Sequence, residues 1–117
     1  MKRLALACFL CLSPMVAMAD GNDLLIACQM VINSQDNQTK LGLENSFGSG
    51  YCLGVITTVA TLARDMPAHL KSCPPAGIPG SQGVRVVVKW LKENPSVLNL
   101  EPAYLTSAAF RAAFPCQ

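Results

Sequence analysis

Apolar side chains recur at helical spacing in the stretch that follows residue 22. A helix over residues 23–33 would place five of them on one face: Leu24, Leu25, Cys28, Val31 and Ile32. Asn22 comes just before this stretch and is a suitable N-cap, because its side-chain oxygen can accept hydrogen bonds from the first turn. Residues 34–40 are polar and show no apolar period, so we expect a loop there.

A second apolar pattern predicts a longer helix from about residue 46 to residue 65. Steps of three or four residues connect its apolar positions, which are Cys52, Val55, Ile56, Val59, Ala63 and Met66. Pro67 should end this helix, since proline cannot continue the hydrogen-bonding pattern. The next segment, between Cys73 and Gly80, contains three prolines and one glycine and is expected to be irregular.

The segment from residue 81 to residue 94 fits two structures. Its VRVVV sequence, residues 84–88, has high strand propensity. The alternative is a helix, because no partner strand is evident and the i, i+3, i+4, i+7 positions are all apolar: Val84, Val87, Val88 and Leu91. We expect the helix, with Ser81 as its N-cap and Pro95 directly after its end.

A fourth helix is expected over residues 103–114, because Pro102 suits the first helical position and the stretch is rich in alanine. A chain of 117 residues has the length of one domain. Four helices without a strand predict an all-α fold, a small four-helix bundle.

The first nineteen residues have the pattern of a secretory signal peptide. Two basic residues precede an apolar run over residues 4–12, and Ala17-Met18-Ala19 supplies the small residues at which signal peptidase cuts. We predict a signal peptide over residues 1–19, cleaved after Ala19, and a helical domain over residues 20–117. The apolar run is much shorter than the roughly 20 residues that span a bilayer, so we expect no membrane insertion after cleavage.

The alternative for this region is a lipoprotein signal acylated at Cys8 or Cys11. Cys8 follows only seven residues, too few for a complete signal, and Leu10 stands before Cys11 where a small residue is required. Cleavage after Ala19 is therefore favoured, and it places the protein outside the cytoplasm.

Four cysteines remain after cleavage, namely Cys28, Cys52, Cys73 and Cys116. An even number in an exported domain of fewer than 100 residues predicts two disulfides, for which three pairings exist. If neighbouring helices run antiparallel, as in an up-and-down bundle, Cys28 and Cys52 face each other across the first loop. Cys73 and Cys116 follow the second and fourth helices at one end of the bundle. We therefore predict the pairs Cys28–Cys52 and Cys73–Cys116.

The side chains that carry most enzyme chemistry are sparse in this sequence. The cysteines are 24, 21 and 43 residues apart and His69 is the sole histidine, which does not fit a zinc site. His69 and Cys73 could form a nucleophilic pair only with a free thiolate at Cys73, and an oxidised cysteine cannot be one. The seven acidic residues are scattered. We therefore expect no enzyme activity, no catalytic residue, no cofactor and no metal.

Two glycines, Gly50 and Gly54, lie four residues apart in the second predicted helix. Residues 48–54 do not match the spacing of a dinucleotide-binding loop, and no strand precedes them. The glycines permit another backbone to approach closely, so we expect tight packing inside the bundle, with a homodimer contact as the alternative.

The charge balance argues against nucleic acid as a partner. The formal net charge of +2 comes entirely from Lys2 and Arg3. The remaining seven basic and seven acidic residues cancel, and the basic residues form no cluster in the sequence. A neutral domain lacks the positive surface that binds phosphate backbones.

Several short motifs follow one another in a distinctive order. They are Gly50-Tyr51-Cys52-Leu53-Gly54-Val55-Ile56, Cys73-Pro74, Gln82, Val84-Arg85-Val86-Val87-Val88-Lys89-Trp90-Leu91, Asn94-Pro95 and Ala112-Ala113-Phe114-Pro115-Cys116. In this order, and behind a signal peptide, they resemble the Rap/Tai family of immunity proteins over residues 23–116.

The resemblance implies a mostly helical periplasmic protein that inhibits a peptidoglycan amidase delivered by a type VI secretion system. Such amidases are papain-like cysteine peptidases, and the family inhibits them by occluding the catalytic groove. The implied partners are a cognate amidase effector and a second copy of the chain. The polar and proline-rich segments at residues 34–45 and 66–81 are the expected contact surfaces. A periplasmic chaperone or stress protein is the alternative function, although one histidine and seven carboxylates offer few groups for an acid trigger.

Overall fold

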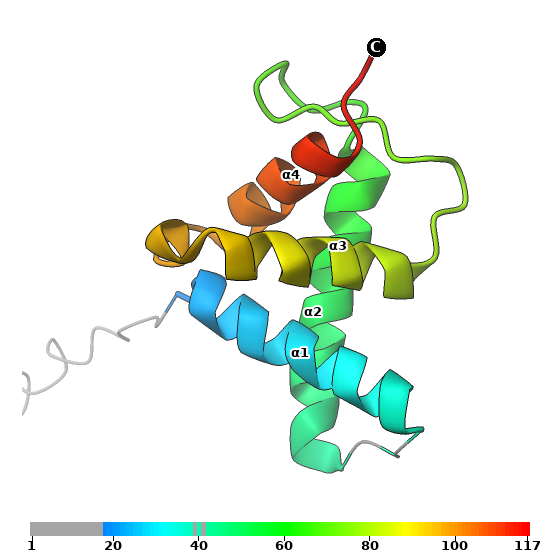
Figure 1. Cartoon of the computed structure of the whole chain (residues 1–117), viewed down its shortest axis with the longest axis vertical. Helices are drawn as coiled ribbons and strands as arrows, with labels where there is room; N and C mark the ends of the chain where they lie inside the picture. Colours follow the sequence, from blue (N-terminus) through cyan, green and yellow to red (C-terminus); the bar gives the residue numbers. More distant parts are fainter. Residues whose placement is uncertain (1–17, 39, 41) are drawn as a thin grey trace, which may run out of the picture.

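The computed structural model describes residues 18–38, 40 and 42–117, and within them the chain forms α-helices and one short 3₁₀ helix but no strand. The α-helices are α1 (Gly21–Asn37), α2 (Leu43–Leu62), α3 (Gly80–Glu93) and α4 (Pro102–Ala113), and the 3₁₀ helix is η1 (Pro95–Val97). The predicted all-α fold is therefore confirmed (Figure 1). Residues 1–17 of the predicted signal peptide, with Cys8 and Cys11, lie outside the described residues.

Helix α2 contacts all three other helices and forms the centre of the fold. In Figure 1, α2 runs steeply through the view, while α1 and α3 lie side by side across it and run in opposite directions. Helix α4 packs on α2 and α3 and touches α1 only slightly. The helices around α2 therefore cross it, whereas the pairing of the cysteines was predicted from an up-and-down arrangement.

One face of each α-helix contributes to a single hydrophobic core. The core contains large side chains that are almost fully buried, among them Leu24, Ile56, Leu91, Leu105 and Phe110. The apolar periods that predict the helices also predict which side chains enter this core, because one face of a surface helix must be removed from water.

Helix α3 settles the ambiguous segment in favour of the helix. Val84, Val87, Val88 and Leu91 are all buried, so the apolar face with a helical period is the face that packs on the other helices. The strand propensity of the valines is overridden because the burial of this face stabilises the helix more than the preference of β-branched residues opposes it.

The N-terminus of α1 lies two residues before the predicted position, and its N-cap is Asp20 and not Asn22. The Asp20 carboxylate accepts hydrogen bonds from the backbone N–H groups of Asn22, at 2.8 Å, and Asp23, at 3.2 Å. Asp23 in turn accepts a hydrogen bond from the Asp20 backbone N–H at 3.2 Å. This reciprocal pair satisfies several free N–H groups of the first turn, which is why the cap forms here.

The C-terminus of α1 also differs, because α1 continues to Asn37 through residues that were predicted to be a loop. Gln38 follows in the left-handed conformation, with a φ angle of 50°, and ends the helix. Only residues 38–42 therefore separate α1 from α2.

The ends of α2 and α3 are shifted by a few residues from the predicted ones. Helix α2 begins at Leu43 and ends at Leu62, where a turn follows in place of the last predicted residues. Helix α3 has Pro79 as its N-cap, and the predicted cap Ser81 lies inside the helix without a capping hydrogen bond. The predicted roles of two other prolines are confirmed, since α3 ends before Pro95 and α4 begins at Pro102.

Gly21 holds the start of α1 against the segment that precedes α4. Its backbone N–H donates to the carbonyl oxygen of Leu100 at 3.1 Å. A Cβ atom at position 21 would lie 2.3 Å from Leu105 Cδ1 and 2.7 Å from the Leu98 carbonyl oxygen. Only glycine fits this close approach.

Both predicted disulfides, Cys28–Cys52 and Cys73–Cys116, are confirmed, with Cα atoms 5.1 Å and 5.0 Å apart. The first joins α1 to α2 inside the core, and the second joins the segment after α2 to the segment after α4. Each bond links residues that are distant in sequence, which restricts the unfolded chain and so stabilises the fold.

Candidate interaction surface

The two residues with catalytic potential, Cys73 and His69, lie in positions that do not support a nucleophilic pair. Cys73 is bonded to Cys116, so it has no thiolate to offer. His69 is exposed, and its backbone carbonyl accepts a hydrogen bond from Arg111 Nη1 at 2.6 Å. Across the part of the chain that is described, no three His, Cys, Asp or Glu side chains come together as a metal site would require.

The α2–α3 connection, residues 63–79, is the longest irregular segment between helices, and its first two residues, directly after α2, hold two later points of it. The backbone N–H of Ser72 donates to the Ala63 carbonyl oxygen at 3.1 Å. The Arg64 guanidinium donates to the Pro74 carbonyl oxygen at 3.1 Å. These bonds fold the connection back onto the helix from which it leaves.

Helix α4 and the residues after it hold the same connection from the other side. The Cys73 backbone N–H donates to the Phe114 carbonyl oxygen at 2.8 Å, and the Cys73–Cys116 disulfide lies beside this bond. Ser107 Oγ lies 3.5 Å from the sulfur of Met66. Together with the Arg111 contact to His69, these interactions fix the connection at several points along its length.

Exposed residues occur along most of the connection, and residues 75–78 form a short turn within it. The backbone of this turn is bridged by a hydrogen bond of 3.3 Å from the Ile78 N–H to the Pro75 carbonyl oxygen. Pro75, Ala76 and Gly77 are exposed, and Gly77 has a φ angle of +74°, which glycine adopts without strain. An exposed turn on a rigid base is a typical recognition element, because it reaches outward and little conformational entropy is lost on binding.

A cavity of about 310 Å³ lies between the proline-rich part of the connection and α2. Its walls include Ile56 and Thr61 from α2, Pro74 and Ile78 from the connection, and Phe110 from α4. The turn at residues 75–78 lines one side of this cavity, and its exposed residues are accessible to a partner.

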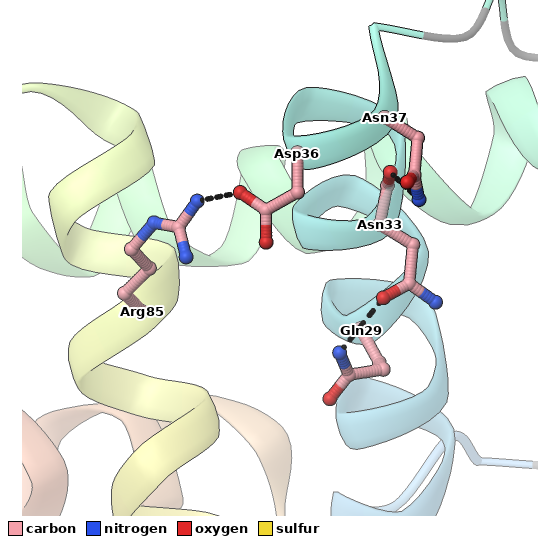
Figure 2. Close-up of polar contacts among 5 residues, drawn as sticks. All are labelled: Gln29, Asn33, Asp36, Asn37 and Arg85. Carbon is pink, nitrogen blue, oxygen red and sulfur yellow. Dashed lines mark hydrogen bonds and ion pairs between the residues drawn. The ribbon is translucent and has the colours of Figure 1, made fainter.

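The other predicted contact segment, residues 34–45, is helical at 34–37 and 43–45, and its first part is held to α3. Figure 2 shows the Asp36 carboxylate at the end of α1 paired with the guanidinium of Arg85 on α3. Further along the helix, Gln29 Nε2 donates to Asn33 Oδ1 at 3.1 Å, and Asn37 Nδ2 donates to the Asn33 carbonyl oxygen at 2.9 Å (Figure 2). Fewer residues of this segment are therefore irregular than the sequence predicts.

Gly50 and Gly54 do not pack inside the bundle, so the prediction of tight internal packing was wrong. Both are exposed, and a Cβ atom at either position would meet nothing within 4 Å. They lie on an exposed face of α2 with other uncharged residues, among them Phe47, Thr58 and Leu62. Residues 45–63 contain no charged side chain at all.

Two titratable groups near the start of α1 are shifted by their surroundings. The hydrogen bond from the Asn22 side chain, followed by that from the Asp23 backbone, lowers the pKa of Asp20 below its usual value of 3.8. Burial raises the pKa of Tyr51 on α2, and the negative charges of Asp23 and Asp20 add to this effect. Tyr51 is therefore neutral at physiological pH, and the exposed face of α2 beside it stays uncharged.

Residues 20–116 of the chain match the family model of the Rap1a immunity proteins. The chain belongs to the Rap1a immunity protein family. The resemblance to Rap/Tai immunity proteins over residues 23–116 is thereby confirmed, with a match that begins at the N-cap of α1. Neither the curated proteins nor the solved structures contain a match to this chain.

Membership of the Rap1a family makes this chain an immunity protein, which acts against a toxin effector. Immunity proteins of this kind are generally not enzymes, and they act by binding. The sequence correctly indicated the α2–α3 connection as an exposed segment, but it did not reveal which part of the connection faces solvent. The sequence also did not reveal that α2 leaves an uncharged face exposed, because its apolar residues occur on nearly all sides of the helix.

Proposed function

We propose that this Rap1a protein is exported to the periplasm, where it binds a peptidoglycan amidase effector of a type VI secretion system and occludes its catalytic groove. The family match over residues 20–116 is the observation that carries the proposal, because it assigns the chain to proteins that act against toxin effectors. A target in the cell wall fits the signal-like residues 1–19.

The disulfides support export. The two disulfides require an oxidising compartment to form and persist. No helix within residues 18–38 or 42–117 is both long and apolar enough to cross a bilayer. N-terminal sequencing of the protein from a periplasmic extract tests the processing directly, and we expect the sequence to begin at Asp20. A protein that begins at Met1 would contradict export by cleavage.

The turn at residues 75–78 is the part of the molecule that best fits a groove. It is largely exposed, it contains no charged side chain, and bonds to Arg64 just after α2 and to Phe114 just after α4 hold its base. A papain-like peptidase binds extended chain in its groove, and prolines at positions 74, 75 and 79 keep this part of the chain from forming a helix. The segment at residues 34–45 is the competing contact surface.

Binding measurements with two matched variants distinguish these surfaces. The amidase encoded next to the gene is titrated with wild-type protein, with Ala76→Arg in the turn and with Gln35→Arg near the end of α1. Both positions are exposed, so each variant adds one positive charge and a long side chain to a surface without disturbing the core. We expect calorimetry to show that Ala76→Arg weakens binding at least tenfold, while Gln35→Arg binds like the wild type.

The possible results test the proposed function and the proposed contact surface separately. If the wild type forms no complex with the amidase at micromolar concentrations, the proposed function is wrong. If the wild type binds and only Gln35→Arg weakens the complex, the function stands and the surface at residues 75–78 is wrong.

The proposal includes a homodimer through the exposed face of α2. Gly50 and Gly54 would let the backbone of a second α2 approach closely, and this surface contains no charge that would be buried unpaired. Exposed apolar side chains at Phe47 and Leu62, with exposed fractions of 78% and 49%, would be removed from water in such a dimer.

A further inference from the structure

The two disulfides lie in very different surroundings. Cys28 and Cys52 both have an exposed fraction of 0%, so their bond is sealed in the hydrophobic core between α1 and α2. Cys116 is exposed and Cys73 is partly exposed. The Cys73–Cys116 bond therefore lies at the surface, while the other bond is buried.

We propose that the Cys73–Cys116 bond is a thiol-exchange site, a clamp that a dithiol oxidoreductase can open without unfolding the protein. Cys28–Cys52 is then the permanent cross-link. Disulfide exchange needs a thiolate that approaches one sulfur along the line of the S–S bond, so access decides which bond reacts. The partner is a protein with an exposed pair of thiols.

The exchange proceeds in two balanced steps. A thiolate of the reductant attacks the sulfur of Cys116, the more exposed cysteine, and forms a mixed disulfide while Cys73 leaves as a thiolate that takes a proton from water. The second thiol of the reductant loses its proton and attacks its own partner sulfur, which releases Cys116 as a thiol. The clamp gains two electrons and two protons, and the reductant becomes a disulfide.

Opening the clamp would affect the α2–α3 connection more than the rest of the fold. The disulfide lies beside the hydrogen bond from the Cys73 N–H to the Phe114 carbonyl oxygen, which joins the connection to the chain just after α4. Residues 115–117 are exposed, so little apolar contact holds them once the bond is cut. The helical core retains the Cys28–Cys52 bond.

The effect on partner binding rests on the proposed function, because the connection carries the turn at residues 75–78. Reduction of the clamp would loosen the base of this turn and weaken the amidase complex. The thiol-exchange site itself does not depend on the amidase, so it can be tested on the protein alone.

The oxidised, processed protein is incubated with increasing dithiothreitol, free thiols are alkylated at intervals, and peptides are identified by mass spectrometry. We expect Cys73 and Cys116 to become alkylated at least ten times faster than Cys28 and Cys52. Hydrogen exchange of the Cys73 amide should accelerate at least tenfold in the same samples, while the Cys52 amide inside α2 stays protected. Simultaneous alkylation of all four cysteines, or earlier alkylation of Cys28 and Cys52, would overturn the proposal.

A double variant provides the control for the clamp. Cys73→Ser/Cys116→Ser should retain the helical circular dichroism of the wild type, show fast exchange near residue 73 without reductant, and show no further change when reductant is added at low concentration. Loss of the helical signal in this variant would mean that the bond is structural and would contradict the proposal. If the clamp opens selectively and amidase binding is unchanged, the exchange site stands and its link to the proposed function is wrong.

Discussion

Gly21 is the residue whose identity the fold requires most strictly. It begins α1, and its missing side chain allows the helix to touch Leu98 and Leu105. Gly80 offers a matched comparison, because it begins α3 and a Cβ atom there would make only an ordinary contact, 3.8 Å from Leu53 Cδ2. The two positions have the same place in a helix and differ in the space around them.

We therefore expect different results from the same substitution. Gly21→Ala should lower the free energy of unfolding by about 1–3 kcal/mol, because a backbone carbonyl in contact with the added methyl group cannot move aside freely. Gly80→Ala should change it by less than about 0.5 kcal/mol. Urea unfolding followed by circular dichroism measures both, and a Gly21→Ala protein as stable as the wild type would contradict the close packing at this position.

Asp20 makes the stability of the fold depend on pH in the acid range. Hydrogen bonds to its carboxylate lower the pKa of Asp20 in the folded protein. The ionised carboxylate therefore caps α1 more strongly than the protonated carboxyl group does. A lowered pKa means that this stabilisation is complete above the unfolded value and is lost as the pH falls through the folded value.

Asp20→Asn isolates this effect, because asparagine can still accept the capping hydrogen bonds but does not titrate. The melting temperature of the variant should fall less steeply than that of the wild type as the pH decreases from about 5 to about 2. Asp65→Asn, at an exposed position after α2, serves as the control and should follow the wild type. Identical slopes for the wild type and Asp20→Asn would show that the cap does not titrate as described.

Among the helices, α1 and α3 are joined across their surfaces by the ion pair of Asp36 and Arg85. The two side chains have exposed fractions of 54% and 49%, so water and salt screen their attraction. The Lys89–Glu93 pair lies within α3 alone, with its charged atoms 3.9 Å apart. Of these two pairs, the first connects two helices, and its Asp36 lies in the last turn of α1.

Arg85→Gln should therefore destabilise the fold by less than about 1 kcal/mol at low salt, and the difference should disappear at about 1 M NaCl. Lys89→Gln should have a smaller effect, because it removes a weaker and more exposed pair. Chemical unfolding at both salt concentrations measures the differences. A loss from Arg85→Gln that persists in high salt would contradict a screened surface pair.

The sequence was sufficient to locate all four α-helices, the first three from apolar residues at helical spacing and the fourth from Pro102 and an alanine-rich stretch. It could not predict that α1 extends to Asn37, since residues 34–37 have no apolar period and Asp36 pairs with a residue 49 positions away. The N-cap at Asp20 was missed because its partner Asp23 takes the place of the usual Glu or Gln of a capping box.

The pair Cys73–Cys116 could be predicted because both cysteines lie in segments that follow helices, after α2 and after α4. Cys28 and Cys52 pair near the middle of α1 and α2, and not beside the first loop as the up-and-down arrangement assumes.

That Gly50 and Gly54 face outward could not be predicted from the sequence. Helix α2 is apolar on nearly every side, so its apolar period does not distinguish the core face from the exposed face. Which residues of the α2–α3 connection are exposed depends on hydrogen bonds to Ala63 and Phe114 that have no sequence signature.

At the scale of the whole molecule, the open face of α2 predicts self-association. Analytical ultracentrifugation should find twice the monomer mass for the wild type and the monomer mass for Gly54→Arg, because the arginine would block close approach and bury a charge. Asn45→Arg, on another side of the same helix, should remain dimeric. A wild type that stays monomeric at concentrations of about 0.1 mM would contradict the homodimer.

Inhibition of the amidase is the most direct test of the central claim. Cleavage of peptidoglycan stem peptides by the amidase encoded next to the gene is measured while oxidised, processed protein is added. If the protein plugs the catalytic groove, activity falls in proportion to the protein added and vanishes near one chain per amidase, whereas Ala76→Arg inhibits only at much higher concentrations. Full amidase activity in the presence of excess wild-type protein would contradict the account.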